Sequence, residues 1–304
     1  MGRPRASVVI VSWNAARVLD ACLASVATQE LEGGFETVVL DNGSTDETHA
    51  VLAKHAGHIR TLRNEENKRY AAANNQAAAE ASGDVLLFLN NDTEMHGSDT
   101  LATIVEAVER PGVGVVGPRL VNPDGTLQPS CAPFPGVGRA LLTAAGLVRL
   151  LPDRARRRSA ADHWSHDAAA DVDWIMGAAI AVPAELFRRL GGFWPTMYGE
   201  DEDLAYRVRR LGLRVRYEPA AEVMHIGRFS SGQRWAAPER AAIVARAEAT
   251  FLRTHYAPAR AAAIRSIRAG GYAARVVAYA LLGRRDAVAL YRAMARAILA
   301  PEAN

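Results

Sequence analysis

The chain has 304 residues, 49% of them hydrophobic and 23% charged, so it can bury a core and is neither disordered nor fibrous. Its formal charge of +3, with a sequence pI near 9.0, is too small to indicate a nucleic-acid-binding protein. The two cysteines, Cys22 and Cys131, lie far apart without a CxxC pair, so neither a disulfide framework nor a cysteine zinc site is indicated.

Short apolar runs alternate with segments of helical periodicity through the first third of the chain. Strands are expected at 7–12, 36–40, 59–63, 85–89 and 113–116, and helices at 16–27, 44–55, 70–81 and 98–109. Ser44-Thr45-Asp46-Glu47 has the form of a capping box, and Ser98 is expected to cap the last of these helices. This order predicts an α/β fold with a mostly parallel sheet and helices on both faces.

The alternation breaks between Asn122 and about Asp171. This segment contains prolines at 123, 129, 133 and 135, the arginine-rich run 154–158 and a polar stretch, which predicts either a functional loop or disorder. Regular structure is expected to resume at 175–182, followed by helices at 183–190 and 202–211 and strands at 215–217 and 222–225. From Pro238 onward only helices are expected.

Three predicted strands end in clusters of short polar side chains. These clusters are Ser12-Trp13-Asn14, Asp41-Asn42-Gly43-Ser44 and Asn90-Asn91-Asp92. A single cluster of this kind is most simply a turn. In open parallel sheets, however, ligands bind beyond the carboxyl ends of the strands, so three clusters on one edge favour a site for a polar ligand.

Asp92 follows the most apolar predicted strand, where an unpaired carboxylate would be costly. A divalent cation bridging Asp92 to a diphosphate would supply the counter-charge, and Mg²⁺ commonly binds in this way. The alternative is that Asp92 or Thr93 simply ends the strand in a turn. His225 ends another predicted strand, and it would join this site only if the fold brings it near Asp92.

Four consecutive acids occupy positions 200–203. A solvated helix start is the usual explanation, because the helix dipole favours acids in a first turn. The same position would keep an acid ionised near pH 7, as a general base requires.

Two other nucleotide-binding patterns are not met. The segment GVGVVG at 112–117 matches GxGxxG, but Pro118 follows it where the dinucleotide-binding motif has a helix. A nucleotidyltransferase would need a glycine-rich, lysine-bearing loop after the first strand, and 12–17 has neither feature. The remaining alternative to an enzyme is a non-catalytic module that binds a sugar nucleotide or a membrane.

With these residues in place, the sequence resembles the family 2 glycosyltransferases of the GT-A fold, in particular the bacterial rhamnosyltransferase-like branch that builds cell-surface polysaccharide. The resemblance extends from about Ser7 to Tyr256. The segments that carry it are VVIVSWN, VVLDNGSTD, Asn67 with YAAAN at 70–74, VLLFLNNDTE, GAAIAVPAELFRRLGGF, YGEDEDLAYRVRRLG and EVMHIGRFSSG. It implies a GT-A domain at 1–237 and a basic helical extension at 238–304.

The resemblance also implies roles for the polar residues. Asp92, in the place of the last acid of the family's DXD signature, would bind Mg²⁺ or Mn²⁺ together with His225. Trp13 would stack on the nucleotide base. The residues expected to bind the nucleotide sugar are Ser12, Trp13, Asn14, Asp41, Asn42, Asn74, Asn90 and Asn91.

The implied reaction is a single inverting displacement, in which Asp201 removes the proton of the acceptor hydroxyl and Glu200 positions the acceptor. The donor would be dTDP-rhamnose ahead of UDP- and GDP-linked sugars, and the acceptor a saccharide or a polyprenyl-linked saccharide.

The chain departs from the family pattern in three places. Arg69 replaces the glycine that usually precedes Tyr70, and it either reaches a phosphate or blocks the family's backbone geometry. The segment 194–197 is about two residues shorter than in relatives, which affects the acceptor side. The segment Asn122–Asp171 matches nothing in the family.

The last part of the chain carries a net positive charge. Residues 238–304 contain eleven arginines and four acids, so residues 1–237 have a net charge of −4. Arginine-bearing apolar helices are expected at 272–282 and 287–299, which indicates either membrane-surface elements or a helical cap on protein. The family resemblance favours the membrane.

The first strand-like run begins at Ser7, which leaves no room for a signal peptide, and no run of about 18 apolar residues could span a membrane. The expected location is therefore the cytoplasm. Peripheral contact with the inner face of the plasma membrane is expected as well.

Overall fold

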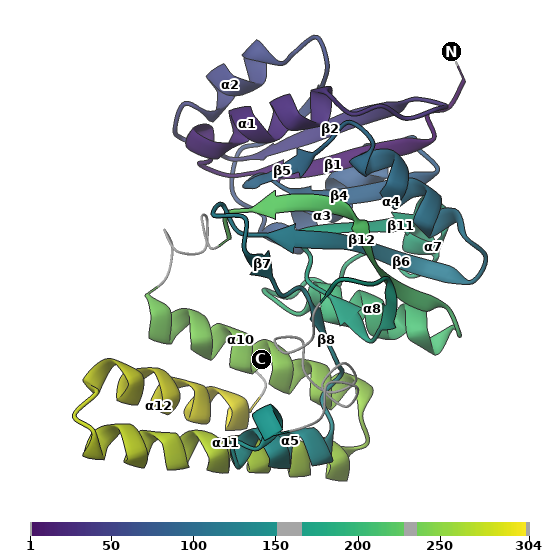
Figure 1. The fold of residues 1–304 in the computed structure, drawn as a ribbon. Coiled ribbons are helices and arrows are strands. Elements are labelled where there is room, and N and C mark those ends of the chain that lie inside the picture. The colour runs from purple at the N-terminus through teal and green to yellow at the C-terminus, as the bar shows by residue number, and fades with distance from the viewer. Residues whose placement is uncertain (1, 151–165, 228–235, 302–304) are drawn as a thin grey trace. The chain divides into compact units, whose positions relative to one another are not determined.

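The computed structural model of the chain describes residues 2–150, 166–227 and 236–301 (Figure 1). The chain divides into two compact units. The first comprises residues 1–132, 165–195 and 200–230, and the second comprises 133–164, 196–199 and 231–304. The arginine-rich run at 154–158 lies outside the described residues. The division of the chain at residue 237 stays a prediction.

The first unit is built on a mostly parallel sheet, as predicted (Figure 1). Among the described residues its strand order is β3-β2-β1-β4-β11-β6-β12-β5, with β7 and β9 paired at the side. Only β11 and β5 on this path run against the others. The strands are β1 (Ala6–Ser12), β2 (Phe35–Asn42), β3 (Arg60–Asn64), β4 (Val85–Asn90), β5 (Thr93–His96), β6 (Val113–Val121), β7 (Leu127–Gln128), β9 (Ala170–Val172), β11 (Ala179–Pro183) and β12 (Arg214–His225), with a separate pair formed by β8 (Cys131–Ala132) and β10 (Trp174–Ile175).

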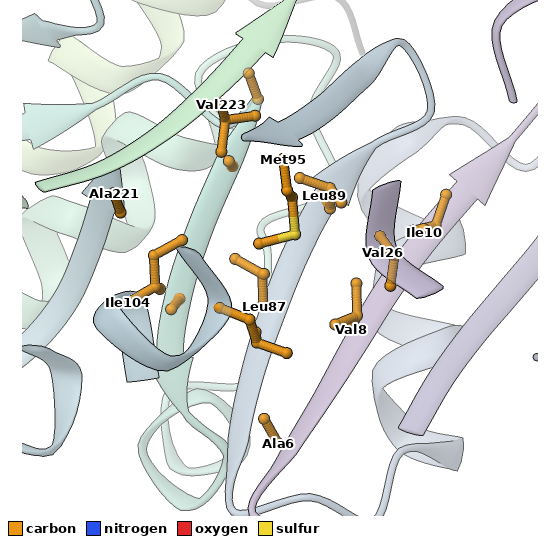
Figure 2. Close-up of a cluster of buried hydrophobic side chains, with 14 of the residues drawn as sticks. Ala6, Val8, Ile10, Val26, Leu87, Leu89, Met95, Ile104, Ala221 and Val223 are labelled. Atoms are coloured by element: carbon orange, nitrogen blue, oxygen red, sulfur yellow. The ribbon is translucent and has the colours of Figure 1, made fainter. Parts of the chain in front are cut away.

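Helices of the first unit cover both faces of the sheet. They are α1 (Ala16–Ala27), α2 (Thr48–Lys54), α3 (Tyr70–Glu80), α4 (Thr100–Glu109), α7 (Ala184–Arg189) and α8 (Glu200–Arg210). Because successive strand residues point to opposite faces, the continuous apolar runs of β1 and β4 supply two cores. Figure 2 shows one of them, where Val8 and Leu87 pack with Val26 of α1 and Ile104 of α4.

The second core lies on the opposite face and is aromatic. The ring of Phe88 in β4 lies 4.7 Å from that of Phe187 in α7 and 4.6 Å from that of Phe193, measured between ring centroids. The buried alanines of α3, which are Ala71, Ala73, Ala77 and Ala78, let this helix pack closely on β1 and β2. Packing in the two cores holds the strands of the sheet in place, and with them the edge on which the three polar clusters lie.

Two of the predicted helix starts are wrong. The helix α2 begins at Thr48 and not at Ser44, because the Ser44 hydroxyl accepts a hydrogen bond from the backbone of Asn14 at 3.0 Å instead of capping the helix. Asp46 bonds the Thr48 backbone N–H at 3.1 Å in its place. Likewise α4 begins at Thr100 without a side-chain cap.

The second half of the first unit also differs from the prediction. The strand β5 (Thr93–His96) was not predicted. The run 175–182 is interrupted at 176–178, so it forms β10 and β11 rather than one segment. The strands expected at 215–217 and 222–225 form one strand, β12, which has an irregular register between Glu218 and Glu222. All three differences bear on the site below.

The second unit is helical over its described residues, which confirms the prediction of helices after Pro238 (Figure 1). Its elements are α5 (Val137–Ala144), the 3₁₀ turn η1 (Val148–Leu150), α10 (Ala237–His255), α11 (Pro258–Leu281) and α12 (Arg285–Leu299). Small side chains such as Ala249 and Ala297 form the packed core between helices. Across the described parts of the chain, no helix combines the length and apolar character required to cross a bilayer.

Candidate active site

The carboxyl ends of β1, β2 and β4 meet on one edge of the sheet. In the strand pairing Ser12 lies opposite Asp41, and Val11 lies opposite Asn90. The three polar clusters are therefore neighbours, as the sequence pattern indicated. Trp13 is half-buried just beyond β1.

Three buried polar atoms of predicted site residues have no hydrogen-bond partner among the described residues. They are the hydroxyl oxygen of Ser12, Oδ1 of Asn90 and Oε2 of Glu200. Buried polar groups in folded proteins are nearly always hydrogen-bonded. These atoms therefore remain available to bind a polar ligand.

The loop after β2 is held in a defined shape. Asp41 accepts a hydrogen bond from the Ser44 backbone at 3.0 Å, and its other oxygen lies 3.7 Å from Nε of Arg63. Gly43 has a φ of +80°, and a Cβ atom there would lie 2.8 Å from the backbone carbon of Glu66. Only glycine fits such a close approach with positive φ. Asn14 joins the loop to β1 by accepting a bond from the backbone of Thr45 at 2.8 Å.

Asn42 and Asn74 use their side chains within the fold. The Asn42 amide donates to Asn67 at 3.2 Å and accepts from the Asn64 side chain at 3.0 Å. The Asn74 amide donates to the backbone carbonyl of Tyr70 at 3.0 Å. Both residues thereby hold the 64–69 loop and the start of α3 in place, and their contact with a nucleotide stays a prediction.

The fold brings His225 to Asp92. The pairing of β12 with β5 places His225 opposite Thr93, and the backbone of Ile226 donates to the Asp92 carbonyl at 3.0 Å. As a result Nε2 of His225 lies 3.4 Å from Oδ1 of Asp92, and both residues are only 6% exposed. His225 is therefore close enough to Asp92 for the two residues to form one site. Asn91 is buried in the same turn.

Asp92 and His225 fit a divalent cation that also binds a ligand. Two adjacent ligands of an octahedral Mg²⁺ lie about 3 Å apart, close to the observed separation of the two side chains. Among the described residues no group of three or more acidic, histidine or cysteine side chains could hold a metal ion. A cation here would have two protein ligands, which is the usual arrangement when phosphate oxygens complete the shell.

The helix α8 starts at Glu200, so the acid pair lies in its first turn. Oδ2 of Asp201 accepts a bond from the backbone of Gly177 at 2.8 Å, and Oδ1 accepts one from the backbone of Glu202 at 2.8 Å. The carbonyl of Gly177 in turn accepts a bond from the Tyr70 hydroxyl at 3.1 Å. Sequence reasoning did not identify Gly177 as part of the site, because it treated 175–182 as one continuous segment.

Burial changes the protonation of the acid pair from what the helix position alone suggested. Burial raises the pKa of Asp201 above that of an ordinary aspartate, although the two backbone N–H donors oppose the shift. Burial and the charge of Asp201 raise the pKa of Glu200 to about 8. The cost of burying charge therefore outweighs the helix dipole. Near pH 7 Glu200 is protonated, and Asp201, with its two donors, is the better carrier of the pair's negative charge.

Replacement of Glu200 by glutamine is expected to stabilise the protein increasingly as the pH rises. The folded-state pKa of Glu200 is raised, so the wild type loses stability between the ordinary glutamate value and about pH 8, because in this range the carboxyl is ionised in the unfolded state and still protonated in the folded state. Glutamine removes that loss, which is on the order of a few kcal/mol. Thermal unfolding at pH 5, 7 and 9 measures the effect. The matched control is Glu185→Gln in the first turn of α7, and a pH-independent difference for Glu200→Gln would contradict this account.

Arg69 adopts a backbone conformation that belongs to glycine. Its φ is +69° and its ψ is 165°, just before Tyr70 at the start of α3. Of the two outcomes that the sequence left open, the arginine does not block the backbone geometry expected of glycine. Residues other than glycine are strained in this region by about 1–3 kcal/mol.

Arg69→Gly is therefore expected to raise the free energy of unfolding by about 1 kcal/mol, after the entropic cost of glycine in the unfolded chain. Arg69→Ala removes the same side chain but keeps the strain, so it is the matched control. Chemical denaturation of the three proteins measures the difference. Equal stability of the glycine and alanine variants would show that the backbone is not strained here.

Comparison with known proteins agrees with this arrangement. Residues 7–142 match the model of the family described as glycosyl transferase family 2. The O-antigen biosynthesis protein RfbC of Myxococcus xanthus is 30% identical over 232 residues, which cover 74% of this chain and 17% of RfbC. The N-acetylglucosaminyl-diphospho-decaprenol L-rhamnosyltransferase of Mycobacterium tuberculosis is 28% identical over 240 residues, covering 74% of this chain and 77% of that enzyme.

The chain spans a quarter or less of the length of two of the curated relatives it matches. Among solved structures, the mannosyltransferase PcManGT from Pyrobaculum calidifontis, in complex with GDP-Man and Mn²⁺, has a TM-score of 0.61 and 22% identity. That similarity covers 97% of this chain and 86% of PcManGT, and it shows that the fold is GT-A. Together with the fold, the family model leads to one conclusion: residues 7–142 of the chain form a glycosyl transferase family 2 domain.

Proposed function

We propose that the chain is an inverting, metal-dependent glycosyltransferase that moves a sugar from a nucleotide-sugar donor to a saccharide or lipid-linked saccharide. The observation that carries the proposal is the environment of Tyr70. Burial raises the pKa of its phenol, and the nearby carboxyl groups of Glu200, Asp201 and Asp92 raise it further. The Tyr70 hydroxyl also bonds Gly177, whose backbone N–H bonds Asp201, so the acid pair and Asp92 both lie near one side chain, as expected of a site that joins donor and acceptor.

On the donor side, Asp92 and His225 would hold a divalent cation together with the diphosphate of the donor. Such a cation supplies positive charge that offsets the negative charge of the leaving nucleoside diphosphate. The unpaired oxygens of Ser12 and Asn90 lie on the same edge and would bind the nucleotide sugar. Asp41, fixed by Ser44, would hold the ribose, with Trp13 against the base.

On the acceptor side, Asp201 would accept the proton of the attacking hydroxyl. Its two backbone hydrogen bonds fix the direction of the carboxylate, which leaves one further lone pair on each oxygen for the acceptor. Glu200, protonated near pH 7 and without a partner at Oε2, would donate a hydrogen bond to the acceptor saccharide. In this proposal Asp201 is the general base, and Glu200 positions the acceptor.

The substrates are inferred from relatives. The mycobacterial relative is named as a rhamnosyltransferase acting on a decaprenol-linked diphospho-sugar, and PcManGT binds GDP-Man with Mn²⁺. A rhamnosyl donor linked to dTDP is therefore the first candidate, ahead of UDP- and GDP-linked sugars. A polyprenyl-linked saccharide is the first candidate for the acceptor, in the synthesis of cell-surface polysaccharide.

A thermal-shift panel tests the donor half of this proposal. The protein is heated with dTDP-, UDP- and GDP-sugars, each with Mn²⁺ or with EDTA. A ligand at 100 times its Kd stabilises the folded state by about 2.7 kcal/mol, so one donor with Mn²⁺ is expected to stand out. Absence of a shift with every donor in Mn²⁺ would count against a nucleotide-sugar site.

We further propose that the helical second unit contacts an anionic membrane surface in the cytoplasm. At the end of α11, Leu281 and Leu282 are 84% and 68% exposed, and Arg284 and Arg285 follow after one glycine. Apolar side chains beside arginines are typical of helices that lie on anionic lipid.

Sedimentation with vesicles tests this contact. Binding to phosphatidylglycerol vesicles, but not to phosphatidylcholine vesicles, is expected for the wild type. The double variant Leu281→Ser/Leu282→Ser should bind at least several-fold more weakly, because it removes apolar area that would enter the lipid. Leu211→Ser, at an exposed leucine of the first unit, is the control. Equal binding by the double variant and the wild type would place any membrane contact elsewhere.

A further inference from the structure

A chain of hydrogen bonds lies behind the ring of His225, on the side away from Asp92. Nδ1 of His225 lies 2.6 Å from Oε1 of Gln128, while Nε2 faces Oδ1 of Asp92 at 3.4 Å. Gln128 is in β7, near the start of the segment 122–171 to which the sequence assigned no role. The pairing of β7 with β6 and the position of His225 at the end of β12 bring the two residues together.

The direction of each bond in this chain is set by a carboxylate at its far end. Asp124 can only accept, so the Thr126 hydroxyl donates to it. The Thr126 oxygen then accepts from the Asn122 amide nitrogen at 2.9 Å. Oδ1 of Asn122 is thereby turned toward Gln128, whose Nε2 donates to it at 2.9 Å.

A second contact supports the same orientation of the Gln128 amide. Its Nε2 also donates to the backbone carbonyl of His225 at 3.1 Å, which cannot donate. If the Gln128 amide were flipped, its oxygen would face two hydrogen-bond acceptors, Oδ1 of Asn122 and the backbone carbonyl of His225. Oε1 of Gln128 must therefore face Nδ1 of His225, and Nδ1 must carry the hydrogen.

This protonation state leaves a lone pair on Nε2 of the neutral ring. The lone pair is directed toward the region of Oδ1 of Asp92, so two acceptors face each other across 3.4 Å. A cation bound by both atoms satisfies this arrangement, whereas a ring with its hydrogen on Nε2 could not bind one there. Histidines that bind metals in proteins generally depend on such a partner at the other ring nitrogen.

We propose that Gln128 is a positioning residue that keeps His225 protonated at Nδ1 and so leaves Nε2 free to bind the divalent cation. Asn122, Thr126 and Asp124 set the orientation of the Gln128 amide. The inference rests on the metal dependence in the proposed function. It gives the first residues of the 122–171 segment a role in the site.

Gln128→Met tests the proposal, because methionine keeps the length of the side chain without its amide. The matched control is Gln29→Met. Gln29 is 6% exposed and makes the same number of hydrogen bonds, to the backbones of Ser25, Gly97 and Leu101, in a network that does not include Asp92 or His225. Each variant loses an amide that makes three hydrogen bonds, and thermal unfolding reports whether each is folded.

Two readouts are taken on the full-length protein. The affinity for Mn²⁺ alone is measured by electron paramagnetic resonance of the free ion. The tautomer of His225 is read from long-range ¹H–¹⁵N correlations at a basic pH, with His225→Asn used to assign its signals. The second readout requires neither metal nor activity.

The wild type is expected to show Nδ1 protonated and Nε2 free. Gln128→Met should lose this signature and bind Mn²⁺ about 10- to 100-fold more weakly, whereas Gln29→Met should keep both properties. A wild-type ring protonated at Nε2, or wild-type Mn²⁺ affinity in Gln128→Met, overturns the proposal. If the wild type binds no Mn²⁺, the metal dependence of the proposed function fails, and the tautomer measurement still decides the role of Gln128.

Discussion

Replacement of Asp201 by asparagine is expected to lower the rate of sugar transfer by about 10²- to 10⁴-fold, the usual contribution of a positioned general base. The substitution keeps the size of the side chain but removes the group that accepts the acceptor's proton. Because Asp201 is held by the backbones of Gly177 and Glu202, its removal should not disturb the sheet edge that binds the donor. Donor affinity, measured by titration calorimetry with Mn²⁺, should stay within a few-fold of the wild type.

Asp203→Asn is the matched control for this substitution. It removes an equal charge from the same turn of α8, where Asp203 pairs with Arg207. The control should lower thermal stability, because Arg207 also holds the carbonyls of Leu190 and Gly192, yet leave transfer per folded molecule within a few-fold. Full activity of Asp201→Asn would show that another group takes the proton.

Replacement of Asp92 by asparagine is expected to lower Mn²⁺-dependent transfer by on the order of 10²- to 10³-fold, equivalent to the several kcal/mol that a bound cation contributes. The amide keeps the shape of the side chain but supplies no charge to the cation beside His225. The variant should also need at least a tenfold higher Mn²⁺ concentration for half-maximal activity. Initial rates across a Mn²⁺ titration, after treatment with EDTA, measure both effects.

The control for this substitution is Asp99→Asn, an exposed aspartate just before α4 that caps no backbone group of that helix. It is expected to follow the wild-type Mn²⁺ curve. A wild-type Mn²⁺ response in Asp92→Asn would place the cation elsewhere and would also remove the basis for a metal-binding role of His225.

The sheet edge at the carboxyl ends of β1, β2 and β4, where the donor is proposed to bind, could be predicted because it depends on local patterns. The strands β1, β2 and β4 are short apolar runs that end abruptly in Asn, Asp and Ser, and a parallel sheet aligns such ends without further information. The neighbouring positions of Ser12 and Asp41 follow from that pattern alone. The resemblance to a family then added roles that the pattern could not supply.

The pairing of Asp92 with His225 could not be predicted from local patterns. It depends on β5, whose four residues, TEMH, include a single apolar side chain and form a strand by pairing with β12. Strand formation in such segments is decided by tertiary neighbours rather than by propensity. Gln128 was missed for the same reason, since its two-residue strand lies in a proline-rich segment.

The protonation of the acid pair also depends on tertiary structure. Four acids at a helix start indicated a solvated turn, and the helix dipole indicated an ionised base. The segment that contains Gly177 buries Asp201 instead, and burial dominates the pKa of both acids. No spacing of residues in the sequence reports how deeply a carboxylate will be buried.

The most direct test of the account is release of nucleoside diphosphate from a sugar nucleotide in the presence of a polyprenyl-linked acceptor. The purified protein is incubated with dTDP-, UDP- and GDP-sugars, each with Mn²⁺ or with EDTA, beside the Asp201→Asn variant. The account predicts that one donor is consumed by the wild type with Mn²⁺, that EDTA abolishes the release, and that the variant binds this donor without consuming it. Release that persists in EDTA, or that is undiminished in Asp201→Asn, would contradict a metal-dependent transferase with Asp201 as its base.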